Sequence, residues 1–253
     1  ATACRVESHA DLMRDAGDDR ECAIEPLGET TLLLRFGERI DDVLNARVHA
    51  ATAALQAAAL RGVIDLVPAY AALAIEYAPQ AWAVGEGPAW RQLADAVRAV
   101  LIAPPAHVEH PAATIVIPVC YGGEQGPDLG ALAAHCGLSE NAVIARHAAG
   151  EYRVAMLGFA PGFAYLIGLD PTLQMPRRTN PRLRVARGSI GIGGAQTGIY
   201  PSELPGGWRL IGRTPLTLFD PLHEPASAVA AGDRVRFRAI DAREFDALER
   251  QRR

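Results

Sequence analysis

The chain has 253 residues, of which 49% are hydrophobic and 21% are charged, a balance typical of a soluble globular protein with one large or two small domains. No window reaches the roughly 18 apolar residues of a membrane span, and the N-terminus lacks an apolar signal core, so we expect a cytoplasmic protein with no membrane partner. All 25 basic residues are arginine, which excludes a P-loop lysine, a Schiff base and a biotinyl-lysine on this chain. The net charge of −4 predicts no nucleic-acid partner.

Metal-ligating residues do not cluster along the sequence. The four cysteines are too scattered for a Cys-x-x-Cys site, and a cytoplasmic chain keeps such thiols reduced. His107 and His110 lie close together, but two histidines alone are not a zinc site. We therefore predict no metal site on this chain.

The first half of the chain predicts a small α+β domain over residues 23–103, preceded by a polar, acidic, flexible leader over residues 1–22. Hydrophobic periodicity predicts, in order, strands at 24–27 and 31–36, a helix at 41–60, strands at 62–67 and 72–77, and a helix at 88–101. This order is typical of a ferredoxin-like α/β sandwich, in which helices cover one face of an antiparallel sheet.

The second half predicts a different texture. Residues 104–113 are rich in proline and polar residues, as expected of a linker. A strand then begins at Thr114, followed by helices at 128–136 and 139–148, the second with Ser139 as its N-cap. Short strands separated by Gly/Pro turns follow at 152–157, 183–186, 189–192, 208–211, 216–219 and 234–239. They predict a barrel or sandwich over residues 114–241, with a C-terminal tail over 242–253.

The functional candidate is the segment from Gly150 to Gly212. It contains twelve of the chain's 24 glycines, so tight turns and close backbone approach are concentrated there. Residues 177–187 add five arginines, whose guanidinium groups suit carboxylate or phosphate ligands. The stretch Gly-Phe-Ala-Pro-Gly-Phe-Ala-Tyr-Leu at 158–166 fits a pocket wall, with a packed barrel corner as the alternative.

Individual residues in this segment are assigned as follows. Arg177 and Arg182 follow Pro176 and Pro181, where the chain direction is fixed, and we predict that they clamp an anion and act in catalysis. The other three arginines of 177–187 are assigned to the surface. The predicted substrate-binding side chains are Tyr165, Ser189, Gln196, Thr197 and Tyr200.

Two further features allow both a functional and a structural interpretation. His147 ends a predicted helix close to these motifs, where it would orient substrate or transfer a proton, or else cap helix carbonyls. The Gly-x-Gly element in 188–194 superficially suggests a phosphate loop, but it lacks the Rossmann spacing and no helical pattern follows it. We expect it instead to present neighbouring donors beside the arginines.

Four long motifs in order carry a resemblance to a known family. They are GFAPGFAYL at 158–166, PRRTNPR at 176–182, GSIGIGGAQTGIYP at 188–201 and PGGW at 205–208. Together they resemble the signature of the KipI family, also called allophanate hydrolase subunit 1 or the B-type (PxpB-like) subunit of the bacterial ATP-dependent 5-oxoprolinase. The likeness extends from about Ile24 to Phe237, includes His147 and Tyr152, and implies a cyclophilin-like β-barrel at the C-terminal end.

The resemblance also implies a function. A chain of this kind would be one subunit of an amide-ring hydrolase that opens 5-oxoproline to glutamate, inactive alone and working with LamB/YcsF-like and KipA-like partner subunits. ATP would be a co-substrate, with Mg held in the complex and no cofactor bound by this chain alone. Two alternatives stay open, an inhibitor of a histidine kinase and subunit 1 of a urea- or allophanate-processing carboxyltransferase.

Overall fold

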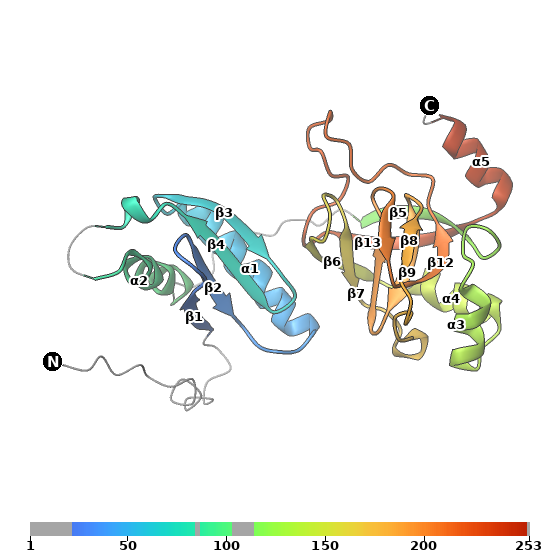
Figure 1. The fold of residues 1–253 in the computed structure, drawn as a ribbon, viewed down its shortest axis with the longest axis horizontal. Coiled ribbons are helices and arrows are strands. Elements are labelled where there is room, and N and C mark those ends of the chain that lie inside the picture. The colour runs from blue at the N-terminus through green and yellow to red at the C-terminus, as the bar shows by residue number, and fades with distance from the viewer. Residues whose placement is uncertain (1–21, 84–86, 103–113, 252–253) are drawn as a thin grey trace.

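The computed structural model describes residues 22–83, 87–102 and 114–251, and Figure 1 shows them as two units. The expected leader, apart from Cys22, and the expected linker lie outside the described residues. The first unit contains β1 (Ala23–Pro26), β2 (Thr31–Arg35), α1 (Asp42–Ala58), β3 (Val63–Pro68), β4 (Ala72–Tyr77), the short 3-10 turn η1 (Pro79–Ala81) and α2 (Ala89–Ile102). Each predicted helix and strand of this half is present, with ends shifted by one or two residues.

The first unit is an antiparallel four-stranded sheet in the order β1-β2-β4-β3. Alternate residues of β4, namely Leu73, Ile75 and Tyr77, are buried on one face, as the two-residue period of a strand requires. They form one core with apolar residues of both helices, including Val48 of α1 and Leu93 of α2. The helices therefore pack on a single face of the sheet and contact each other there.

The second unit is a closed seven-stranded barrel in the order β10-β7-β6-β13-β5-β12-β9. Its strands are β5 (Thr114–Tyr121), β6 (Tyr152–Leu157), β7 (Ala164–Ile167), β9 (Ser189–Gly193), β10 (Gln196–Ile199), β12 (Arg209–Arg213) and β13 (Arg234–Ile240). A separate pair is formed by β8 (Arg182–Val185) and β11 (Leu204–Gly206). Closure leaves the barrel without free edges, so the expectation of a barrel or sandwich resolves to a barrel.

Helices flank the barrel. They are α3 (Leu129–Cys136), α4 (Glu140–Ala149) and α5 (Ala242–Gln251), with a further 3-10 turn, η2 (Pro171–Leu173). Ser139 is the N-cap of α4, as predicted, because its hydroxyl accepts a hydrogen bond from the Ala142 amide at 3.2 Å. The residues expected as a tail form α5, whose Phe245 is buried against the barrel. None of the helices in the described ranges has the length and apolarity needed to cross a membrane.

Three strands were missed and one was wrongly predicted. β7, β10 and β11 are three or four residues long and rich in glycine or flanked by it, so they leave almost no periodic pattern. The segment 216–219 is not a strand, because only Phe219 forms an isolated bridge, to Ser227. Its Leu218 is buried in the barrel core, which explains an apolar pattern without a ladder.

Glycines in β9 and β10 make room for one tryptophan. A Cβ atom at Gly191, Gly193 or Gly198 would lie 3.0 Å or less from atoms of Trp208. The Gly-x-Gly element is therefore a bed for an indole ring. Its backbone groups belong to the barrel ladder, since β9 is buried along its whole length and pairs with both β10 and β12, so it does not fit a phosphate cradle.

Candidate functional site

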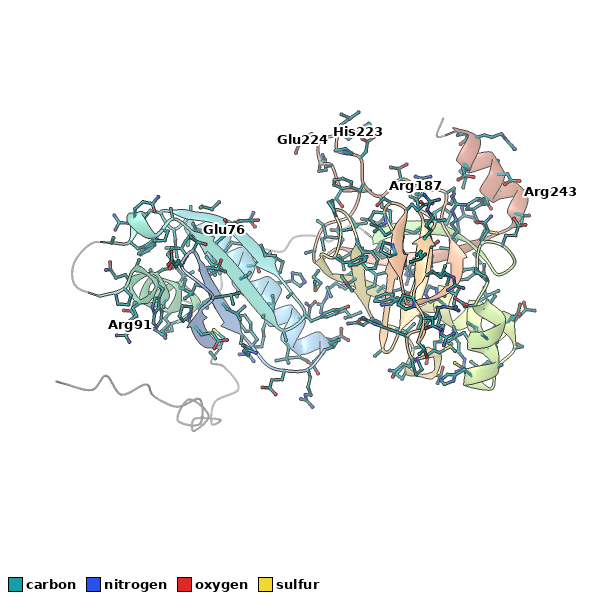
Figure 2. All side chains as sticks on the ribbon, in the orientation of Figure 1. Glu76, Arg91, Arg187, His223, Glu224 and Arg243 are labelled. Carbon is teal, nitrogen blue, oxygen red and sulfur yellow. The ribbon has the colours of Figure 1, made fainter. Side chains whose placement is uncertain are left out.

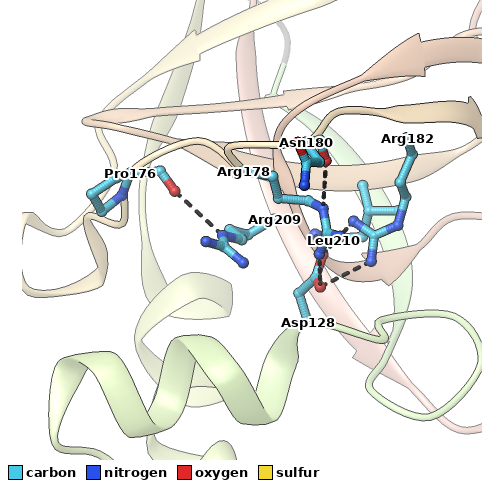
Figure 3. Close-up of polar contacts among 7 residues, drawn as sticks. All are labelled: Asp128, Pro176, Arg178, Asn180, Arg182, Arg209 and Leu210. Carbon is cyan, nitrogen blue, oxygen red and sulfur yellow. Dashed lines mark hydrogen bonds and ion pairs between the residues drawn. The ribbon is translucent and has the colours of Figure 1, made fainter.

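Asp128 organises the arginine cluster and was not singled out from the sequence. Arg182 forms a two-pronged pair with its carboxylate, at 2.8 and 2.9 Å, and the Leu210 amide donates to it at 2.7 Å. Figure 3 shows Arg178 reaching the same carboxylate, at 3.4 Å. Asp128 is 5% exposed. Burial alone would raise its pKa, but these donors outweigh burial and hold the pKa below its usual range.

The loop that carries Arg177 is fastened on both sides. The Pro176 carbonyl oxygen accepts a hydrogen bond from Arg209 Nε at 3.3 Å, and the Arg178 amide donates to Gly207 O at 2.7 Å (Figure 3). Arg178 is half-buried and paired, which corrects its assignment to the open surface. Between these anchors the Arg177 side chain is exposed, and no ion pair to it is found within the described part of the chain.

Arg177 lies beside an aromatic cluster, which we define as Phe163, Tyr165, Tyr200 and Trp208. Its guanidinium carbon is 5.6 Å from the centroid of the Trp208 ring, within cation–π range. Phe163 sits at the centre, with ring centroids 4.7, 5.1 and 5.7 Å from those of the other three. This cluster is a second apolar core, separate from the barrel interior.

The tyrosines of the cluster remain protonated near neutral pH. Burial raises the pKa of Tyr200 to about 12 and also raises the pKa of Tyr165, while the charge of Arg177 acts in the opposite direction on both. The Trp208 amide donates to the Tyr200 hydroxyl. A guanidinium and neutral hydroxyls along flat apolar walls suit a small carboxylate with an apolar or ring-shaped body.

Ser189 and Gln196 lie at opposite ends of the β9–β10 hairpin. Both are buried, and period-two alternation with Gly191 and Gly193 places them on the Trp208 side of the barrel wall. Gln196 is at the turn end, where the Gly194 amide bonds to Met175 O at 2.8 Å, next to the Arg177 loop. The structure thus brings Gln196 toward the cluster and places Ser189 at the far end of the hairpin.

His147 and Thr197 lie inside the barrel, away from Arg177. His147 is fully buried and stacks on Phe237 at 4.6 Å. The Thr197 hydroxyl donates to Gly191 O at 3.0 Å, so at 3.3 Å it accepts from Nε2 of His147, whose Nδ1 then accepts from the Tyr121 hydroxyl at 2.8 Å. Burial lowers the pKa of His147 to about 3. The ring is therefore neutral at working pH, which favours a structural role over proton transfer.

The two units contact each other at a seam, which we define as Asp42, Asn45, His49 and Tyr70 of the first unit with Arg153, Ala155 and Tyr165 of the barrel. Asn45 Nδ2 donates to Ala155 O at 3.2 Å and Arg153 donates to Asp42 O at 3.0 Å. The Tyr70 and Tyr165 rings meet edge to face at 5.9 Å. The seam thus adjoins the aromatic cluster, and Figure 2 shows side chains filling the space between the units.

The comparisons with known proteins agree with this architecture. Residues 22–229 match the family model described as "Carboxyltransferase domain, subdomain C and D". A protein of Bacillus subtilis, named as the B-type subunit of 5-oxoprolinase, is 39% identical over 239 residues, which are 90% of this chain and 97% of that protein. Its namesake of Escherichia coli O157:H7 is 57% identical over 123 residues, covering 49% of this chain and 56% of the relative.

A solved structure extends the comparison to the fold. The crystal structure of TTHA0988 superposes with a TM-score of 0.72 at 37% identity, covering 84% of this chain and 40% of that one. The fold and the site define a carboxyltransferase-domain protein of the subdomain C and D type. The chain belongs to the family whose members include proteins named as the B-type subunit of 5-oxoprolinase.

Proposed function

We propose that this chain is the B-type subunit of an ATP-dependent 5-oxoprolinase that opens the 5-oxoproline ring to glutamate. The observation that carries the proposal is the 39% identity to a protein named for that role, along 97% of the relative's length. The ferredoxin-like and cyclophilin-like assignments of the two units, and a cytoplasmic location, belong to the same proposal. So do the two partner subunits, one KipA-like and one LamB/YcsF-like.

Within this proposal, Arg177 binds the substrate carboxylate. Its loop is fixed by neighbouring hydrogen bonds, so little ordering is required when an anion arrives. The aromatic cluster forms the wall beside the ring and limits access of water. Arg182 is a positioning residue in this scheme, because both prongs of its guanidinium engage Asp128.

The nucleotide is assigned to the partner subunits. The β9 glycines do not fit a phosphate cradle, and the described residues contain no group of three or more His, Cys, Asp or Glu side chains that would hold a magnesium ion. ATP would supply activation of the lactam carbonyl in the complex. The residues of this chain would bind and orient the substrate.

Reconstitution tests the proposal. The purified chain should show negligible 5-oxoprolinase and ATPase activity alone and should gain both when the KipA-like and LamB/YcsF-like subunits are added. Turnover by this chain in isolation, or an inactive complete complex with all three subunits folded and associated, would contradict it.

The family description favours one second candidate, subunit 1 of a urea- or allophanate-processing carboxyltransferase. The same assembled complex should be supplied with urea or allophanate and a biotin carrier chain. Turnover of these compounds, with none of 5-oxoproline, would favour that candidate. A kinase-inhibitor role would instead appear as reduced autophosphorylation of a histidine kinase when the chain is added.

A further inference from the structure

The turn between β3 and β4 presents a tyrosine to the barrel. Tyr70 lies in this turn, which the Ala69 amide closes through a 2.8 Å bond to Ala72 O. Asn45 Nδ2 lies within 3.3 Å of Tyr70 O and also bonds to Ala155 O of β6. The turn is therefore held against the barrel by one amide that contacts both units.

The Tyr70 hydroxyl is buried and has no hydrogen-bond partner among the described residues. A buried hydroxyl without a partner is destabilising, and such groups in folded proteins require an explanation. Burial raises the pKa of Tyr70 well above its usual value, while the charge of Arg177 acts in the opposite direction. At neutral pH the group is thus a protonated donor close enough to sense Arg177.

Unpaired polar atoms are concentrated at the seam. Five buried side-chain atoms in the described ranges lack a partner, and four of them belong to seam residues, namely Asn45 Oδ1, His49 Nε2, Tyr70 Oη and Arg153 Nε. Polar groups elsewhere in the described chain are satisfied far more completely. A polar ligand at the seam would supply the missing partners.

We propose that Tyr70, on the first unit, is a further substrate-positioning residue of the site that Arg177 forms on the barrel. The inference rests on the proposed function. The ligand is a small cyclic amide bearing a carboxylate. Arg177 binds the carboxylate, the Tyr70 hydroxyl donates to a ring oxygen, and Tyr165 lies between them as an apolar wall. Substrate binding would then require both units.

The test is Tyr70→Phe in the assembled complex, which removes one hydroxyl and keeps the ring. We expect KM for 5-oxoproline to rise about five- to tenfold with a smaller change in kcat, and the melting shift induced by 5-oxoproline to shrink. Melting without ligand should stay equal or rise, because an unpaired buried hydroxyl has been removed. Tyr77→Phe, a buried tyrosine of the first unit's own core, is the matched control and should keep the parent KM.

The outcomes separate the two proposals. Parent turnover with an unchanged KM and an unchanged ligand-induced melting shift in Tyr70→Phe would overturn this inference and leave the proposed function intact. If the parent complex shows a melting shift without turnover, the proposed function fails and the size of the shift in Tyr70→Phe decides the inference. If it shows neither, both fail.

Discussion

The barrel interior and the seam treat their buried polar groups in opposite ways. Inside the barrel, His147 bonds through both ring nitrogens, and its carbonyl oxygen accepts from the Tyr152 hydroxyl at 2.9 Å. At the seam, four buried polar atoms have no partner in the described chain. The first region is complete by itself and the second is not. Changes in the first should therefore reduce stability, and changes around the second should reduce binding with little loss of stability.

The largest effect should follow Asp128→Ala. This change leaves Arg182 and Arg178 without their carboxylate and the Leu210 amide without its acceptor. We expect the free energy of unfolding of the purified chain to fall by about 3 kcal/mol, measured by urea denaturation. Activity of the complex should fall only as far as the folded fraction and the Arg177 loop are lost. A variant as stable as the parent would remove the distinction between scaffold and site.

A pH-dependent loss of stability should come from His147. Its pKa is about 3 in the folded chain, below the usual value of 6.5. Its contribution is therefore complete above about pH 6.5 and is lost as the pH falls toward 3, with about 2 kcal/mol lost between pH 7 and pH 5. His147→Gln should flatten this dependence in urea denaturation, whereas His223→Gln, at an exposed position, should keep it. Equal slopes in all three proteins would show that His147 is accessible to protons.

Arg177 and Arg182 should separate in a way that their sequence context does not predict. We expect Arg177→Ala to reduce activity of the reconstituted complex at least about tenfold while the melting temperature stays near the parent value. Arg182→Ala should lower both, because it leaves Asp128 buried without its main partner. Activity and melting should be measured on the same preparations. If Arg177→Ala loses activity only by unfolding, the assignment of Arg177 to the site is wrong.

The smallest effect should follow Arg184→Ala. Its guanidinium pairs with Glu203 at 3.1 Å, but both side chains are largely exposed. Such pairs contribute about 0.2–1 kcal/mol at most, so stability and activity should stay within about 0.5 kcal/mol and about twofold of the parent. A larger loss of activity with unchanged melting would place Arg184 at an interface with another protein of the complex.

Sequence patterns predicted most helices and strands because periodicity and capping are local. Ser139 as an N-cap and the alternation in β4 are examples. The sequence also drew attention to Arg177 and Tyr165. It missed Asp128, a lone carboxylate 54 residues from Arg182 whose pairing depends on barrel closure. It missed Tyr70 for the same reason, since only the tertiary fold brings the first unit to the barrel.

One error was avoidable from the sequence. Gln196 and Thr197 are adjacent in a strand, so their side chains must point to opposite sides, and both cannot line one site. Thr197 faces the barrel interior and bonds with His147. The short strand β10 was not predicted, and without it the alternation was not applied.

Direct binding of 5-oxoproline to the assembled complex tests the central claim most directly, because binding does not depend on turnover. Calorimetric titrations should compare the parent with Arg177→Ala and with Arg184→Ala as the matched control. The exposed, fixed Arg177 predicts that its variant binds at least about tenfold more weakly at an unchanged melting temperature, while Arg184→Ala binds as the parent does. Equal affinity of the parent and Arg177→Ala for 5-oxoproline would contradict the account.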